Sequence, residues 1–352
     1  MVKYAFENSK IKGISSSVPV KEKNLLDEPD LYGGNKKKLD RVINSSGFLK
    51  RRITENETAS DLCFEAAEDL IKNLNTDKEQ IDALLFVSSM PDYLLPASSY
   101  VLHKRLGLSQ DCICMDIPQA CSGFVIGLYQ ASMLVNSGCR KVLLLTGDTF
   151  SKFTDMFNNN TAPVFGDAGT AALIEYDKNA EKMYFNINSD TKDYDALICR
   201  NGAFRNPVKK SDFYENGQYM YKAEMDGGRV FDYTMNNAAS NIQELLDFTG
   251  MKTDDIDEFI FHQANKFILE NIARKLNIEP ERISTETLSN YGNQCGASIP
   301  CTISNVLSDK VSTQNVKCLL SGFGAGLSRA SAIVNLDRIY CSKLNNFKGT
   351  QA

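Results

Sequence analysis

The chain has 352 residues, of which 43% are hydrophobic and 24% charged, and this length allows two units that each bury a hydrophobic core. A net charge of −5 and a pI near 5.3 argue against a nucleic-acid-binding protein, which would present a basic surface. No apolar run approaches the roughly 18 residues of a membrane span, and the first residues lack the apolar stretch of a secretory signal.

The ten cysteines are scattered through apolar runs and do not show the spacing of a disulfide framework. We therefore expect reduced thiols and a cytoplasmic protein. No Cys-x-x-Cys pair has a second His or Cys pair to complete it, so we expect no zinc or other metal site.

In chain order, the first half predicts helices that alternate with buried strands. An amphipathic stretch over residues 59–71 precedes the apolar strand Leu84-Leu85-Phe86, and a later apolar strand leads into Thr146-Gly147. Continuous apolar strands between amphipathic helices indicate parallel strands that are covered on both faces.

The second half repeats this pattern at an offset of 175 residues. The matching segments are Ile81-Asp82 with Ile256-Asp257, Leu84-Leu85-Phe86 with Phe259-Ile260-Phe261, and Leu144-Leu145-Thr146-Gly147 with Leu319-Leu320-Ser321-Gly322. Each half therefore reads helix, buried strand, helix, short strand, helix, buried strand and glycine turn. We predict an α/β protein of two pseudo-symmetric halves, 1–178 and 179–352, with a ligand site between them.

Cys121 is the first candidate functional residue. The apolar run that begins at Cys112 stops at a turn containing proline, and the helical spacing of Phe124, Val125 and Leu128 begins directly after Cys121. Free backbone N–H groups and the positive end of a helix dipole lower the pKa of a thiol at such a position. Free cysteines are among the most buried residue types, however, so this position alone does not establish a nucleophile.

The second half supplies a histidine and an asparagine at comparable positions. His262 follows the strand Phe259-Ile260-Phe261, whereas His103, the other of the two histidines, lies on a predicted helix surface. Asn293 follows Gly292 in a polar loop, as either a turn former or an amide donor. The three residue types fit together, because a thiolate needs a base and a developing oxyanion needs hydrogen-bond donors.

Four ordered motifs resemble those of the 3-oxoacyl-(acyl-carrier-protein) synthase III group of condensing enzymes. They are Asp116-Ile-Pro-Gln-Ala-Cys121-Ser-Gly-Phe, His262-Gln-Ala-Asn265, Tyr291-Gly-Asn293 and Gly322-Phe-Gly-Ala-Gly-Leu-Ser328, with Phe165-Gly-Asp-Ala-Gly169 near the end of the first half. The resemblance covers nearly the whole chain. It implies the thiolase-like fold, in which two related halves form five alternating α-β-α-β-α layers, and a homodimer.

The reaction that this resemblance implies is a decarboxylative Claisen condensation of an acyl thioester with malonyl-acyl-carrier-protein. Cys121 would take the acyl group, and His262 and Asn293 would bind the malonyl thioester carbonyl and stabilise the enolate. Backbone N–H groups of Cys121 and Ala325 would form a second oxyanion hole, and Phe323 would separate the two substrate sides. The donor would be acyl-coenzyme A or acyl carrier protein, and no cofactor is expected.

The residues expected to bind the acyl donor depart from the family pattern. The chain has no Trp, and Arg41 stands where many members carry the Trp of an adenine clamp. Leu95 replaces a bulky aromatic that shortens the acyl pocket, so we expect a primer longer than acetyl, delivered by a carrier protein. Asn265 is assigned to substrate binding, and Lys266 and Arg51 to contact with the acidic acyl carrier protein. Solvated surface charge is the alternative interpretation of the two basic residues.

A homodimer is also expected from the loop Ser88-Ser-Met-Pro-Asp-Tyr-Leu-Leu-Pro96. It is apolar and several residues longer than its counterpart in the second half. In relatives this loop crosses the dimer interface to close the acyl pocket of the neighbour.

Alternative functions remain open at this point. A degradative thiolase would carry a second catalytic Cys in the loop that here reads Gly322-Phe-Gly-Ala-Gly, and a 3-hydroxy-3-methylglutaryl synthase would need a catalytic Glu, of which none stands out. A non-catalytic acyl-binding partner would usually lack the Cys. A condensing enzyme of a secondary-lipid or polyketide-type pathway with a non-acetyl donor fits the sequence equally well.

Overall fold

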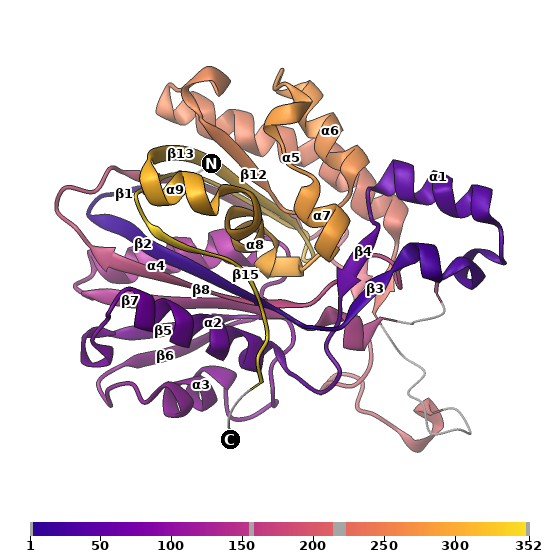
Figure 1. Ribbon diagram of the computed structural model, residues 1–352, viewed down its shortest axis with the longest axis horizontal. Helices are drawn as coiled ribbons and strands as arrows, with labels where there is room; N and C mark the ends of the chain where they lie inside the picture. The colour runs from indigo at the N-terminus through magenta and orange to yellow at the C-terminus, as the bar shows by residue number, and fades with distance from the viewer. Residues whose placement is uncertain (1–2, 155–157, 214–222, 350–352) are drawn as a thin grey trace.

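Two large β-sheets organise the chain, with helices between them and on both outer faces (Figure 1). The computed structural model describes residues 3–154, 158–213 and 223–349. The first sheet has the order β15-β2-β8-β7-β5-β6, with bounds Tyr340–Asn346, Ser9–Val18, Ala168–Tyr176, Lys141–Asp148, Ala83–Val87 and Ile113–Ile117. The second has the order β1-β9-β14-β13-β12, with bounds Tyr4–Phe6, Met183–Ser189, Ser328–Asp337, Asn315–Gly324 and Glu258–Phe261.

The helices form three layers, so the predicted five-layered α-β-α-β-α fold is confirmed. Helices α2 (Ala59–Asn73) and α3 (Ser98–Leu106) cover the outer face of the first sheet, and α5 (Gly227–Thr249) and α6 (Lys266–Lys275) that of the second. Between the sheets lie α4 (Gly123–Asn136) and a long helical run made of α8 (Ser298–Thr302), the π-helical turn Ile303–Leu307 and α9 (Ser308–Thr313).

The apolar strands of the sequence are explained by this layering. In β7, Leu143 and Leu145 pack against the outer helices, whereas Val142 and Leu144 join the core around α4. Successive side chains of a strand point to opposite faces, so a strand covered on both faces must be apolar throughout. The central core extends into the second sheet, where Leu320 joins it from β13.

Short polar motifs set the starts of two helices that matter for the site. Thr58 and Asp61 form a capping box at the start of α2, in which each side chain accepts a hydrogen bond from the backbone N–H of the other. The side chain of Asn265 accepts a hydrogen bond from the backbone N–H of Phe267, 2.8 Å away, and so caps α6. This cap fixes where the chain leaves β12 and turns into α6.

Smaller elements lie at the edges of the two sheets. They are β3 (Glu22–Asn24), α1 (Lys36–Ser46), β4 (Lys50–Arg52), β10 (Leu197–Ile198), β11 (Glu224–Met225) and α7 (Glu286–Tyr291). Helix α1 and the β3–β4 pair project at the right of Figure 1. No helix of the described residues is both long enough and apolar enough to cross a membrane.

Two expectations about the repeat are wrong in detail. The sheets are mixed, because β13 pairs antiparallel with β14 and β7 with β8. Only three residues join β13 to β14, and so short a connection permits only antiparallel neighbours. In the second half, α7 occupies the position where the repeat predicts a short strand, because residues 286–291 lack the alternation of apolar and polar residues that favours a strand.

The two sheets exchange their terminal strands. β1, at the N-terminal end of the described chain, pairs with β9 in the second sheet. β15, at the other end, pairs with β2 in the first sheet. The division into halves 1–178 and 179–352 stays a prediction, and in the structure each sheet contains one strand from beyond that boundary.

Candidate active site

Cys121 lies on the turn between β6 and α4, as expected. The helix begins two residues later at Gly123, and Cys121 is 7% exposed. The turn is closed by a hydrogen bond from the backbone N–H of Gly123 to the carbonyl oxygen of Ala120, 2.8 Å away. Ser122 holds this turn against the second half, because its hydroxyl lies 2.7 Å from that of Ser328.

One cavity brings the predicted catalytic residues of both halves together. It has a volume of about 430 Å³. Cys121 lines it from the first half, and His262, Asn293 and Phe323 line it from the second. Each of these residues is at most 7% exposed, so all four are shielded from bulk water.

The imidazole of His262 is fixed at the end of β12. Its backbone N–H donates to the carbonyl oxygen of Ser321, and its Nδ1 lies 2.8 Å from the hydroxyl oxygen of Ser298. The ring meets Phe323 edge to face, with centroids 5.7 Å apart. Because Nδ1 is engaged by Ser298, Nε2 is the ring nitrogen that remains for the cavity.

Asn293 is held by contacts with both halves. The backbone N–H of Cys295 donates to its side-chain oxygen over 2.8 Å, which leaves the amide NH2 as the group available for the cavity. Its main chain pairs with the first half, since its N–H donates to Val164 and its carbonyl accepts from Gly166. A side chain at Gly166 would lie 2.0 Å from the carbonyl oxygen of Tyr291, so only glycine permits this approach.

The electrostatic surroundings of Cys121 favour the thiolate. A hydrogen bond from the Cys295 thiol holds the pKa of the Cys121 thiol well below its usual range, although burial acts in the opposite direction. The charge and hydrogen bond of His262 and the backbone N–H of Ala325 act in the same direction as Cys295. The pKa of Cys295 is raised in turn, because its proton is held between the two sulfurs.

The glycine-rich turn after β13 packs directly on Cys121. A methyl group at Gly324 would lie 2.7 Å from the Sγ atom of Cys121 and 2.6 Å from its Cβ atom. The turn then brings the backbone N–H of Ala325 to the sulfur. Glycine at position 324 is therefore what allows the second half to reach the thiol.

The sequence resemblance implies that Cys121 takes an acyl group. We expect Gly324→Ala to slow that acylation by about 100-fold, because a displacement of about 1 Å at a reacting atom has a cost of that size. The measurement is the rate at which the intact protein gains the mass of the acyl group. Gly228→Ala is the control, since a methyl group there meets only the side chain of Asp226, at 3.4 Å. Acylation of Gly324→Ala at the wild-type rate would contradict this account of the turn.

The other predicted site residues are divided between the cavity and the surface. Asn265 lines the cavity. Leu95 is 87% exposed and lies outside the cavity of its own chain. Arg41 is exposed on α1 and does not line the cavity either. Lys266, the first residue of α6, has a half-exposed side chain whose Nζ lies 3.8 Å from Glu270.

The assignment of Arg51 to a carrier-protein surface is wrong. Arg51 is 1% exposed, and its guanidinium binds the carboxylate of Glu28 through two contacts of 2.7 and 3.0 Å. It sits on β4 between Lys50 and Arg52, and alternation along a strand turns the middle residue of three inward. Lys50 and Arg52 are the members of this basic cluster that reach the surface, where both contact Glu22.

Three polar residues of the site were not predicted from sequence as functional. Cys295 and Ser298 contact Cys121 and His262, and Asp148 is fully buried nearby. Asp148 accepts hydrogen bonds from the backbone N–H groups of Ser89 and Gly296, and burial raises its pKa to about 7. The signal for Cys295 is its place in the same polar loop as Asn293.

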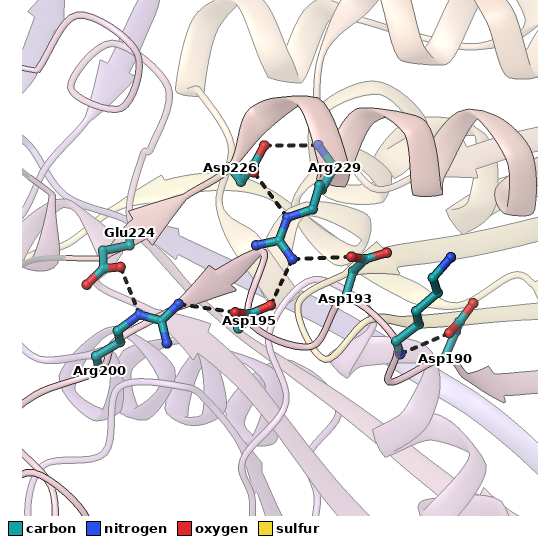
Figure 2. Close-up of polar contacts among 8 residues, drawn as sticks. Asp190, Asp193, Asp195, Arg200, Glu224, Asp226 and Arg229 are labelled. Carbon is teal, nitrogen blue, oxygen red and sulfur yellow. Dashed lines mark hydrogen bonds and ion pairs between the residues drawn. The ribbon is translucent and has the colours of Figure 1, made fainter.

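An ion-pair network supports one wall of the cavity (Figure 2). Leu197 on β10 and Met225 on β11 line the cavity, and Arg229 in the first turn of α5 contacts Asp193, Asp195 and Asp226 beside them. Arg200 binds Asp195 and Glu224 and so extends the network to the end of β10. Because each arginine is shared between several carboxylates, these groups form a connected network and not isolated exposed ion pairs, which contribute little by themselves.

Comparison with known proteins agrees with this fold and site. Residues 115–191 match the family model for 3-oxoacyl-[acyl-carrier-protein (ACP)] synthase III, and residues 246–336 match the model for its C-terminal part. A 3-oxoacyl-(acyl-carrier-protein) synthase from Burkholderia xenovorans is 32% identical, with a TM-score of 0.91 over 98% of this chain and 99% of its own. A β-ketoacyl-[acyl-carrier-protein] synthase III from Streptococcus agalactiae is 31% identical over 84% of this chain and 90% of its own.

The fold is that of the thiolase-like condensing enzymes. A Campylobacter jejuni protein named for the same synthase is 34% identical over 97% of this chain and 98% of its own length. The chain belongs to the 3-oxoacyl-[acyl-carrier-protein] synthase III family. The resemblance of the sequence motifs to this family is thereby confirmed.

Proposed function

We propose that this protein catalyses the decarboxylative condensation of an acyl thioester with malonyl-acyl-carrier-protein to give a 3-oxoacyl-acyl-carrier-protein. The observation that carries the proposal is the cavity in which Cys121, whose thiol has a lowered pKa, meets His262 and Asn293. The names of the relatives agree with this reaction. A non-catalytic acyl-binding partner would have no use for a thiolate held in this way.

The first step is acylation of Cys121. The thiolate attacks the carbonyl carbon of the donor thioester, a new C–S bond forms, and the donor leaves as a thiolate that takes a proton from solvent. The negative charge on the carbonyl oxygen would be bound by the backbone N–H groups of Cys121 and Ala325. Ala325 supports this role, because its N–H already reaches the sulfur in the structure.

The second step is decarboxylation of the malonyl group. The bond to the carboxylate breaks, carbon dioxide leaves, and the electron pair passes to the thioester oxygen as an enolate. His262 Nε2–H and the amide of Asn293 would donate to that oxygen, and one such donor contributes about 3 kcal/mol when preorganised. The enolate carbon then attacks acyl-Cys121, and cleavage of the C–S bond restores the thiolate.

We expect the two half-reactions to separate by mutation. Cys121→Ala should lose acylation and condensation together, because Cys121 is the one thiol among the described residues that line the cavity. His262→Ala and Asn293→Ala should keep acylation measurable and lose condensation by about 100-fold or more, the cost of one oxyanion donor. Intact-mass detection of acyl-enzyme and release of labelled carbon dioxide measure the two steps.

Cys139→Ala and Asn73→Ala serve as matched controls, since both residues lie outside the cavity lining. Loss of acylation in His262→Ala or Asn293→Ala as complete as in Cys121→Ala would show that the roles are not divided in this way. Condensation by Cys121→Ala at a rate near that of the wild type would exclude the nucleophile assignment.

We also propose a cytoplasmic homodimer that uses an acyl carrier protein. The ten cysteines are all free, which suits a reducing compartment. Tyr93, Leu94 and Leu95 are 60%, 71% and 87% exposed on the loop after β5. Three consecutive exposed apolar residues support a contact with a second copy. In such a dimer Leu95 would reach the cavity of the neighbour and leave room for a primer longer than acetyl.

Leu95→Phe should therefore shift the preference from octanoyl to acetyl thioesters, since each substrate CH2 that loses its space costs about 0.8 kcal/mol. The measurement is kcat/KM for both donors, on coenzyme A and on carrier protein, together with the solution mass by light scattering. Leu26→Phe is the control, because Leu26 is 53% exposed on a different surface segment. An unchanged preference, or a monomer at micromolar concentration, would exclude this role of Leu95.

A further inference from the structure

A second group of sulfur and nitrogen side chains lies away from the active-site cavity. His103 belongs to the last turn of α3, Cys112 comes directly before β6, and Cys114 is on β6. One potential ligand atom from each residue lies within 4.8 Å of the other two. Cys112 is 9% exposed, and the other two residues are half-buried.

The packing of α3 against β6 creates this group. Cys112 and Cys114 alternate with Ile113, so their side chains point to the same face of the strand. That face carries the outer core, which both cysteines join together with Leu102 and Leu106 of α3. His103 follows Leu102 on the same helix and completes the group at the edge of this core.

The histidine is oriented as a metal ligand would be. Its Nε2 lies 2.8 Å from the carbonyl oxygen of Ser109. A carbonyl oxygen only accepts hydrogen bonds, so Nε2 donates to it, and Nδ1 is the ring nitrogen that would bind a metal. Imidazoles that bind metals commonly donate their second N–H to a carboxylate or backbone carbonyl in this way.

Both thiols now donate hydrogen bonds to backbone carbonyls. The Cys112 Sγ atom lies 3.7 Å from the carbonyl oxygen of Ile113, and the Cys114 Sγ atom lies 3.8 Å from that of Cys112. These long contacts to sulfur are weak, and a bound cation would displace the thiol protons, because metals bind the thiolate.

We propose that His103, Cys112 and Cys114 form a Zn²⁺ site. Two thiolates and an imidazole are ligands for a borderline or soft cation and not for Mg²⁺ or Ca²⁺. Zinc bonds of about 2.3 Å to sulfur and about 2.0 Å to nitrogen place tetrahedral ligands roughly 3.5–4 Å apart. In the structure the candidate ligand atoms lie within 4.8 Å of one another, so metal binding would have to draw them together by side-chain rotation. Three protein ligands leave the fourth position to water.

This proposal departs from the expectation of no metal site drawn from the sequence. A search for Cys-x-x-Cys pairs misses a Cys-x-Cys pair whose third ligand comes from a neighbouring helix. The ion would join α3 to β6, the edge strand of the first sheet that leads into the turn of Cys121. Its role would be structural, since none of the three residues lines the active-site cavity.

The test uses the full chain with Cys121→Ala as the host, so that the active-site thiolate cannot bind the added metal. Reduced protein stripped of metal with a chelator is titrated with Zn²⁺ against a chromophoric competitor, and with Co²⁺ to detect thiolate charge-transfer absorption. We expect one ion per chain. Cys112→Ser and Cys114→Ser should each weaken binding by more than about tenfold, and so should His103→Gln, whose amide can still donate to Ser109.

Cys139→Ser is the matched control. Cys139 is also half-buried and also close to the first sheet, but it packs against the central core on the other face. It should leave the affinity unchanged. The proposal is overturned if the host shows no thiolate charge-transfer band with Co²⁺, a result that needs none of the ligand variants to fold. It is also overturned if binding survives in the Cys112→Ser, Cys114→Ser double variant or is lost equally in Cys139→Ser.

Discussion

The structure of the site depends on the hydrogen bonds that groups of the second half make to the buried sulfur of Cys121. Ionisation of a buried thiol costs several kcal/mol unless hydrogen bonds and opposite charge compensate it. Here the compensation comes from Cys295, His262 and the backbone N–H of Ala325. They stand on three different loops of the second half, so the lowered pKa of this first-half thiol depends on the packing of the two halves against each other.

Each half of the chain also holds site residues of the other half in place. Asn293 belongs to the second half, yet its main chain is held by Val164 and Gly166 of the first. Asp148 of the first half accepts a hydrogen bond from the backbone N–H of Gly296. Behind these contacts, the core around α4 takes side chains from both sheets, so the site rests on the largest apolar interface of the fold. Loops that lie on such a rigid support can hold catalytic donors to the fraction of an ångström that preorganisation needs.

Much of this arrangement was predictable because it follows from local periodicity. Apolar strands covered on both faces, and functional residues directly after them, indicated the layers and the positions of Cys121 and His262. Asn293 needed the family resemblance in addition, because a residue after glycine in a polar loop is more often a turn former. The strand exchange of β1 and β15 has no local signal, since it depends on where distant ends of the chain pair.

The features that the sequence did not predict depend on side-chain direction and on contacts between distant segments. Arg51 is one residue away from two partly exposed basic neighbours, and only its place on β4 turns it toward Glu28. Cys295 lies 174 residues after Cys121 in the sequence, and their contact forms only when the two halves pack together. The grouping of His103 with Cys112 and Cys114 likewise requires α3 to lie on β6.

The central claim is that the second half holds Cys121 as a thiolate. The most direct test is the pH dependence of Cys121 alkylation by iodoacetamide, followed on the peptide that contains it, in wild type and in Cys295→Ala. The rate follows the ionised fraction and falls as pH drops below the pKa. The account predicts a wild-type midpoint well below the ordinary thiol value of about 8.5, and a higher midpoint once the Cys295 thiol is removed. A wild-type midpoint at about 8.5 or above, or one that Cys295→Ala leaves unchanged, would contradict it.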